Sequence, residues 1–200
     1  MAGTIICFGD SNTYGYDSRS FLGNRYPEDG RWPEILGART EWTVRNFGKN
    51  GRCIPYFLPE ITYVCDRLTQ WKDEASPVWL WVMLGTNDIL HNPQMTAESV
   101  TERMERFLKK MMEREEIRNG SIRLRLISPV HLRRGQWVET DERCRESERL
   151  DDCYRGLAAR FGIAFTCAGN WNIPVLFDGV HFSEDGHRKF ADCAIRELGL

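Results

Sequence analysis

Five short apolar segments along the chain predict β-strands. The third segment is apolar at every position and lies between Pro77 and Gly85, which is typical of a strand buried on both faces of a parallel sheet. The predicted strands are residues 4–8, 42–47, 78–84, 122–127 and 163–167.

Helical spacing of apolar residues fills most of the sequence between these strands. Residues 17–30 are instead polar and rich in turn formers, which indicates a loop, and the dense run of charge over 133–147 indicates a solvated excursion. The predicted helices are 32–36, 57–71, one that follows the N-cap Thr96 and ends near Asn119 and Gly120, one over 150–161, and one that follows the N-cap Ser183.

The regular alternation of strands and helices predicts an α/β fold. Consecutive βαβ units are right-handed and build a parallel sheet that is covered by helices on both faces. No repeat, low-complexity tract or linker divides the sequence, so we expect one domain over residues 1–200.

Polar residues that can carry chemistry follow the predicted strands at one edge of this sheet. Ser11 follows the first strand, the loop 48–51 follows the second, and Asn87 follows the third. Asp178 and His181 lie in the loop between the fifth strand and the last helix. Because ligands of parallel sheets bind beyond the carboxyl ends of the strands, we expect these residues to meet there.

Together these residue types suit acyl transfer, which needs a nucleophile, a base, a carboxylate that orients the base, and donors for the oxyanion. Ser11 lies at a strand-to-loop turn, although an isolated Asp-Ser-Asn would indicate only a cap, and Asp10 is expected to be structural. The Asn87 amide and the backbone N–H of a loop glycine are the candidate oxyanion donors.

Four histidines compete for the role of the base. His91 and His131 also fall in loops at the productive edge, and His187 lies inside the last helix. Only His181 follows a carboxylate, Asp178, by three residues, a spacing that lets the carboxylate reach one ring nitrogen and leaves the other for the serine. A metal site of Asp178, His181 and His187 is the weaker alternative, because the spacing matches no common metal motif.

Composition excludes several other classes of function. The net charge of −2 shows no basic face for nucleic acid, and the longest apolar run is too short to cross a bilayer. We expect a cytoplasmic protein unless an export signal has been removed. Seven scattered cysteines without a Cys-x-x-Cys pair indicate reduced thiols, and only Cys53 lies near the proposed site. No metal or organic cofactor is expected.

The blocks Gly9-Asp10-Ser11, Gly51, Gly85-Thr86-Asn87-Asp88 and Asp178-x-x-His181 resemble those of the SGNH hydrolases, the GDSL-type esterases and lipases. They occur in the family's order and span nearly the whole chain. The resemblance implies a flavodoxin-like three-layer α/β/α fold and a Ser11–His181–Asp178 triad. It also implies an oxyanion hole formed by the N–H groups of Ser11 and Gly51 and by the Asn87 side chain, with Gly48 ending the strand.

Three further segments are similar to the arylesterase and acyltransferase branch of the family: Asn12-Thr13-Tyr14-Gly15-Tyr16, Arg31-Trp32-Pro33 and Asn50-Gly51-Arg52. Asn12 replaces the leucine of the family's first motif, a replacement that is common in this branch. That branch acts on small acyl esters and can pass the acyl group to alcohols. Residues placed to bind substrate are Asn12, Tyr14, Tyr16, Trp32 and Ile54, and for the three aromatic residues and Ile54 packing of the loops is an equal alternative.

We therefore expect a serine esterase for a small-molecule ester with a short acyl chain. The alternatives are a carbohydrate acetylesterase, a lysophospholipase or thioesterase of the same fold, a phosphoesterase that uses Ser11 with thin support from Arg52, and a non-catalytic binding module. The charged segment 133–147 could form a rim of the site or an oligomer contact, and the sequence does not choose between these roles.

Overall fold

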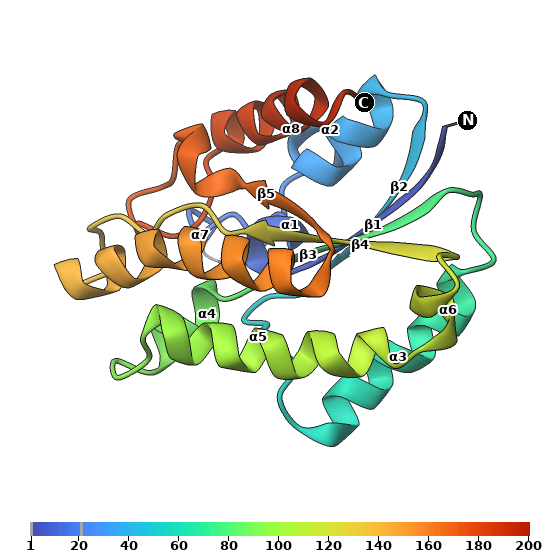
Figure 1. Cartoon of the computed structure of the whole chain (residues 1–200). Coiled ribbons are helices and arrows are strands. Elements are labelled where there is room, and N and C mark those ends of the chain that lie inside the picture. The colour runs from blue at the N-terminus through green and yellow to red at the C-terminus, as the bar shows by residue number, and fades with distance from the viewer. Residues whose placement is uncertain (1, 21) are drawn as a thin grey trace.

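Five parallel strands form one central sheet in the computed structural model, which describes residues 2–20 and 22–200 (Figure 1). The strand order is β2-β1-β3-β4-β5, so β1 lies between β2 and β3. The crossovers that leave β1 in the two directions open a crevice at its carboxyl end, where ligands of such sheets bind. The strands are β1 (Gly3–Gly9), β2 (Trp42–Gly48), β3 (Val78–Met83), β4 (Ile122–Ser128) and β5 (Ala164–Cys167).

Helices cover both faces of the sheet, and the predicted α/β/α architecture is confirmed. Helices α2 and α8 lie on one face, and α3, α5 and α7 lie on the other (Figure 1). The helices are α1 (Ser11–Tyr14), α2 (Trp32–Arg39), α3 (Leu58–Trp71), α4 (Thr86–His91), α5 (Ala97–Met112), α6 (Glu115–Arg118), α7 (Asp141–Phe161) and α8 (Glu184–Leu198), with 3₁₀ turns η1 (Glu28–Gly30) and η2 (Ala168–Trp171).

Each face of the sheet has its own hydrophobic core, because side chains alternate along a strand. In β1, Ile6 and Phe8 pack with α3, α5 and α7. Ile5 and Cys7 pack with α2 and α8 on the opposite face. The central strands β1 and β3 are therefore buried at nearly every position. Their register ends at Gly9 and Met83, and Gly9 lies two residues before Ser11.

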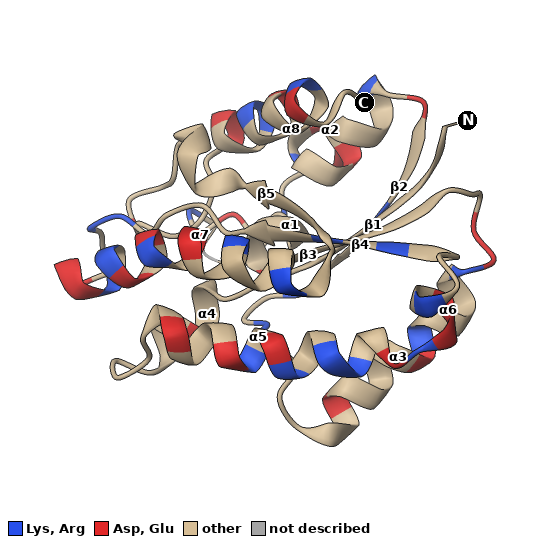
Figure 2. Ribbon diagram, viewed as in Figure 1, with Lys and Arg blue, Asp and Glu red and all other residues tan. Residues whose placement is uncertain are grey.

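Two sequence-based boundaries were wrong. The helix expected to reach Asn119 ends at Met112, since the extended backbone of Arg114 separates it from α6. Residues 141–147, expected to be a solvated excursion, are the first two turns of α7, which has 21 residues. Most charges in this stretch lie on the outward face of the helix (Figure 2), and the residues that it buries, Glu146 and Ser147, are polar. Apolar periodicity therefore did not mark these first turns.

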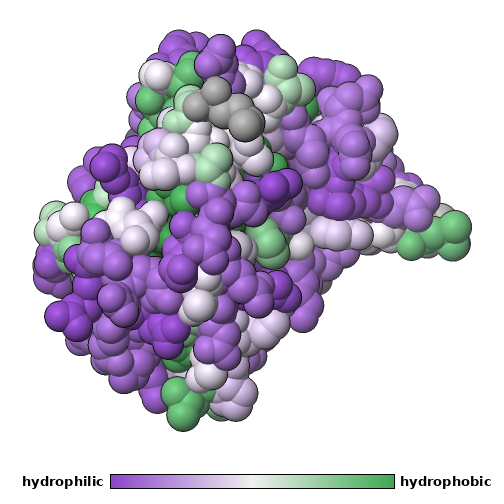
Figure 3. All heavy atoms as spheres, turned by 90° about the vertical axis from the view of Figure 1, so that its right-hand side faces the viewer, coloured by the Kyte–Doolittle hydropathy of each residue, from purple (hydrophilic) through white to green (hydrophobic). Residues whose placement is uncertain are grey.

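The surface is dominated by mixed charges. Lys and Arg alternate with Asp and Glu on the outward faces of α5, α7 and α8 (Figure 2). The end of the molecule where the strands begin is mostly hydrophilic, with hydrophobic residues in separate small groups (Figure 3). No helix in the described part of the chain is long and apolar enough to span a bilayer.

Candidate active site

Ser11, His181 and Asp178 form a continuous chain of hydrogen bonds at the carboxyl end of β1. Ser11 is the first residue of α1, directly after the N-cap Asp10. Its Oγ lies 3.0 Å from His181 Nε2, and His181 Nδ1 lies 2.8 Å from Asp178 Oδ2. All three side chains are buried. The structure thus brings together the three residues that the sequence predicted, in the order a Ser-His-Asp system requires.

The loop that carries Asp178 and His181 folds tightly around the carboxylate. Asp178 Oδ1 accepts the backbone N–H groups of Val180 and His181, each at 2.9 Å. Gly179 makes the turn with φ of +80°, and a Cβ there would lie 2.0 Å from the Arg133 carbonyl oxygen. Burial by itself raises the pKa of Asp178, but the hydrogen bonds from His181 and the backbone outweigh it and lower the pKa to about 2. The carboxylate is therefore ionised at neutral pH.

The Asn12 side chain connects the nucleophile's helix to the histidine loop. Its Nδ2 donates to the Val180 carbonyl at 3.0 Å, and its Oδ1 accepts the Phe182 N–H at 2.9 Å. These two partners lie on either side of His181 in the chain. Asn12, expected to bind substrate, is thus buried and fixes the position of His181 relative to Ser11.

The first turn of the short helix α1 contains a backbone donor at Ser11. Asp10 caps the helix by accepting the Asn12 N–H at 3.0 Å, the structural role expected for it. Burial raises the pKa of this carboxyl to about 6. Across the described residues, the Ser11 N–H has no hydrogen-bond partner.

The glycine that ends β2 and the glycine in the loop after it have different environments. The Gly48 N–H donates to Asn46 Oδ1 at 2.9 Å, and a Cβ at Gly48 would lie 2.1 Å from the Tyr14 nitrogen, so this glycine is needed for packing against α1. Gly51 has φ of +67° and open space where a Cβ would be. Its N–H finds no acceptor among the described residues, which agrees with the choice of Gly51 over Gly48 as the oxyanion candidate.

Asn87 lies in the first turn of α4 and contacts the same loop. Its Nδ2 donates to the Arg52 carbonyl at 3.1 Å. An amide nitrogen carries two hydrogens, so one remains for another acceptor. The structure therefore places the Asn87 amide against the Arg52–Cys53 peptide, one residue beyond Gly51, at the end of the sheet where Ser11 lies.

Two residues that the sequence analysis did not assign to the site brace the Gly51 loop. Arg52 Nη1 donates to the Gly9 carbonyl at 2.8 Å, and the guanidinium stacks 4.2 Å from the centre of the Phe8 ring. Asp88 Oδ2 accepts the Ile54 N–H at 3.0 Å. Asp88 directly follows Asn87 and Arg52 directly follows Gly51, so both residues adjoin predicted donors, although no bracing role was expected of either.

The residues expected to line a substrate pocket have different environments. Tyr16 reaches the triad, with its ring centre 4.7 Å from that of His181. Trp32 is buried against Phe190, and its indole N–H donates to the Asn12 carbonyl, which favours the packing alternative. Tyr14 lies under the Arg25 guanidinium at 4.4 Å.

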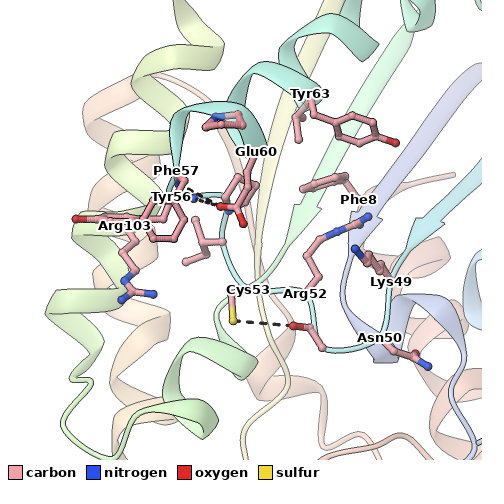
Figure 4. A pocket seen from close by; sticks show the side chains of 15 residues that line it. Phe8, Lys49, Asn50, Arg52, Cys53, Tyr56, Phe57, Glu60, Tyr63 and Arg103 are labelled. Atoms are coloured by element: carbon pink, nitrogen blue, oxygen red, sulfur yellow. Dashed lines mark hydrogen bonds between the residues drawn. The ribbon is translucent and has the colours of Figure 1, made fainter.

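A cavity of about 900 Å³ opens between the 49–57 loop, α3 and α5 (Figure 4). Ile54 contributes to its wall, as does Gly51, but Ser11, Asp178 and His181 do not. Its lining is mostly apolar and aromatic, with cationic side chains at its sides. The labelled lining residues are Phe8, Lys49, Asn50, Arg52, Cys53, Tyr56, Phe57, Glu60, Tyr63 and Arg103.

The sequence analysis missed Trp137, which touches the triad. Its ring centre lies 4.9 Å from that of His181, with the two planes nearly perpendicular. Trp137 belongs to the charged segment for which the sequence left a rim or an oligomer contact open. Because Trp137 lies more than 40 positions from the motif residues, no local pattern in the sequence indicates this contact.

The other histidines are engaged elsewhere. His91 Nδ1 lies 3.5 Å from Cys53 Sγ, and His131 Nε2 lies 2.7 Å from Asp151 Oδ2. His187 is fully buried, and desolvation lowers its pKa to about 3. No cluster of potential metal ligands occurs in residues 2–20 and 22–200.

Comparison with known proteins agrees with this geometry. Residues 7–189 match the GDSL-like lipase/acylhydrolase family. No curated protein matches the chain.

Solved structures share the whole fold. The chain is similar to a putative arylesterase from Agrobacterium tumefaciens str. C58, with 26% identity, 100% of this chain and 99% of that one covered, and a TM-score of 0.80. It is similar to Est24, a carbohydrate acetylesterase from Sinorhizobium meliloti, with 21% identity, 98% of each chain covered and a TM-score of 0.81. An aryl esterase of M. smegmatis has 21% identity, 99% coverage of each chain and a TM-score of 0.80. The chain therefore belongs to the GDSL-like lipase/acylhydrolase family of SGNH hydrolases and is a serine hydrolase that acts on ester bonds.

Proposed function

We propose that this hydrolase cleaves small carboxylic esters with short acyl chains through an acyl-Ser11 intermediate. The observation that carries the proposal is the hydrogen-bonded chain from Ser11 Oγ to His181, at 3.0 Å, and from His181 to Asp178, at 2.8 Å. Water or an alcohol then takes the acyl group, so transfer to alcohols is a second outcome of the same intermediate.

In this mechanism His181 Nε2 accepts the Ser11 proton as Oγ attacks the ester carbonyl. The ionised Asp178 holds the proton on Nδ1 and stabilises the imidazolium that forms. His181 then donates the proton to the departing alcohol oxygen. In the second half of the reaction His181 activates the incoming water or alcohol in the same way.

The oxyanion is stabilised by the N–H groups of Ser11 and Gly51 and by the Asn87 amide. The first two donors lack partners within the described chain, and Asn87 retains one hydrogen beside its bond to Arg52. Donors that are fixed before the reaction and aimed at the developing charge need no rearrangement when the charge appears.

A short acyl chain is favoured by the packing around the nucleophile. Thr13 and Trp32 are buried, the Trp32 indole N–H donates to the Asn12 carbonyl, and a Cβ on Gly9 would lie 2.0 Å from Thr13 Oγ1. The interior side of helix α1 is therefore filled. The solved relatives described as arylesterases and as a carbohydrate acetylesterase also support a small ester.

The test is hydrolysis of p-nitrophenyl acetate, butyrate and octanoate by the wild type and by Ser11→Ala. We expect turnover that falls with acyl length and disappears in the variant. Equal rates in both proteins would exclude Ser11 as the nucleophile. Faster turnover of octanoate would exclude the short-chain preference. When ethanol is added, release of p-nitrophenol without an equal amount of free acid would reveal transfer of the acyl group to ethanol.

A further inference from the structure

The 900 Å³ cavity beside the Gly51 loop has no part in the mechanism proposed above. The residues that line it include Gly51 but none of the three triad residues. Pockets that bind small molecules usually have volumes of about 300–1,000 Å³, apolar and aromatic walls, and a few polar groups that fix the orientation of the ligand. The cavity has this size and composition, so its polar groups decide which ligand it fits.

Arg52 brings two free hydrogen-bond donors to this cavity. Its Nη1 is engaged, because it donates to the carbonyl oxygens of Gly9, at 2.8 Å, and of Phe47. The guanidinium is also held 4.2 Å from the centre of the Phe8 ring. Within residues 2–20 and 22–200, Arg52 Nε and Nη2 have no hydrogen-bond partner. These two N–H groups leave the same edge of the guanidinium, and such an edge matches the two oxygens of a carboxylate.

Lys49 adds a second positive charge at the same side of the cavity. The Arg52 N–H donates to the Lys49 carbonyl at 3.2 Å, so one tight turn carries both side chains. Both line the cavity, and their charged ends lie next to Phe8 (Figure 4). Arg103, a third cation of the lining, is paired with Asp88 at 3.1 Å, whereas no ion pair joins Lys49 or Arg52 to the described part of the chain. Unpaired cations in a partly enclosed apolar site attract an anion.

The remainder of the lining suits an apolar ligand with a single negative charge. Phe8, Tyr56 and Tyr63 form aromatic parts of the wall (Figure 4). Glu60 is the one acidic side chain among the described lining residues, and its Oε2 accepts the N–H groups of Tyr56 and Phe57 at 3.0 and 3.1 Å. Because this carboxylate repels a second charge more than it repels one, a carboxylate ligand is favoured over a doubly charged phosphate.

We propose that this cavity is a binding site for a small organic anion that has one carboxylate and an apolar or aromatic body. The carboxylate accepts hydrogen bonds from Arg52 Nε and Nη2 and pairs with Lys49. The body packs against Phe8 and Tyr63. Since none of the triad residues lines the cavity, this is a second site, and binding to it does not depend on the esterase function.

The test is isothermal titration calorimetry with 4-phenylbutyrate and with 4-phenyl-1-butanol, which has the same skeleton without the charge. We expect the wild type to bind the acid at least about 10-fold more tightly than the alcohol, because hydrogen bonds to charged groups are the strong ones. Lys49→Gln should weaken binding of the acid by about 2- to 5-fold and leave the alcohol unchanged, and Lys49→Arg should restore the acid. Lys72→Gln, an exposed lysine at the far end of α3, should change neither.

Arg52→Gln should abolish the preference for the acid. Arg52 also braces the Gly51 loop, so circular dichroism of this variant must show an intact fold. The Lys49 variants test the site without disturbing that brace, because the Lys49 side chain forms no hydrogen bond with the described residues.

Four results would overturn the proposal. Equal affinity of the wild type for the acid and the alcohol would leave an apolar cavity without an anion site, and no binding of either would leave no site at all. A preference for the acid that survives both Lys49→Gln and Arg52→Gln would place the acid elsewhere. Tighter binding of phenyl phosphate than of 4-phenylbutyrate would replace the carboxylate by a phosphate.

The same carboxylate chemistry has two sources, a free acid and the far end of an ester's acyl chain. Hydrolysis of monoethyl adipate and of the neutral ethyl hexanoate separates them. A higher KM of Lys49→Gln for monoethyl adipate alone would assign the carboxylate to a substrate. Unchanged KM values, together with weaker binding of 4-phenylbutyrate, would assign it to a free acid. Calorimetry involves no turnover, so its outcome is independent of whether Ser11 is the nucleophile.

Discussion

At the scale of single residues, hydrogen-bond donors without partners gather near Ser11. The N–H groups of Ser11 and Gly51 have none among the described residues, and Asn87 uses one amide hydrogen on the Arg52 carbonyl. Unpaired donors lower stability when they are buried. This cost applies to the Ser11 N–H, because Ser11 is buried and Gly51 is exposed. The unpaired Ser11 donor is explained by a role in stabilising the charge that develops on the ester carbonyl.

Asn87→Ala tests this explanation. Loss of one oxyanion donor lowers kcat by about 10²–10³ in comparable sites, so we expect a loss of that size with KM little changed. Asn87→Asp, which keeps the size but replaces the donor by an anionic acceptor, should be at least as impaired. The measurement is p-nitrophenyl acetate kinetics with circular dichroism to confirm the fold, and full activity in the folded Ala variant would contradict the assignment.

At the scale of elements, helix α8 begins directly after the histidine loop. Ser183 caps it, with its Oγ accepting the Gly186 N–H at 3.0 Å, and lies two residues after His181. The helix then packs with α2 through the core that contains Trp32 and Phe190. The end of the triad loop is therefore defined by the start of a helix that is itself held by the core.

Ser183→Ala should reduce the free energy of unfolding by about 1 kcal/mol, the usual cost of losing an N-cap. Urea denaturation gives the measurement. The matched control is Ser121→Ala, an exposed serine outside the helices, which should change stability by less than about 0.5 kcal/mol. Equal small effects of both substitutions would show that the Ser183 cap contributes nothing.

The existence of most elements could be predicted from the sequence, but some of their ends could not. The apolar run after Pro77 and the caps Thr96 and Ser183 are local signals, and the structure has the elements that they mark. The start of α7 at Asp141 was missed because its first turns carry many charges and only a narrow buried stripe, formed by contact with the rest of the fold.

At the scale of the whole molecule, two buried carboxyl groups make the free energy of unfolding depend on pH in opposite directions. Burial raises the pKa of Asp10 to about 6, so the folded protein binds this proton more tightly than the unfolded chain, whose ordinary value is 3.8. Ionised Asp10 therefore lowers stability above pH 6, and stability from this group rises as pH falls from 6 toward 4. Asp178, with its pKa lowered to about 2, contributes stability above pH 4 that is lost as pH falls through 2.

Asp10→Asn isolates the first of these effects. The amide oxygen can still accept the Asn12 N–H, but it does not titrate. As the pH is lowered from 7 to 4.5, we expect the free energy of unfolding of the wild type to rise relative to that of the variant. The expected rise is roughly 1.4 kcal/mol for each unit of pKa difference expressed in that range. The measurement is urea denaturation of both proteins across this range. Parallel curves would show that the Asp10 pKa is the same in the folded and unfolded states.

The sequence by itself determined the alternation of strands and helices, the parallel sheet and the positions of Ser11, Asn87, Asp178 and His181 at one edge of it. These follow from local patterns, since strand periodicity and the βαβ rule place loop residues without knowledge of long-range contacts. Only the tertiary structure decided that Asn12 holds the histidine loop, that Trp32 belongs to the core, and that Trp137 touches His181. Those roles depend on contacts between segments far apart in the chain, which packing selects and which no local pattern encodes.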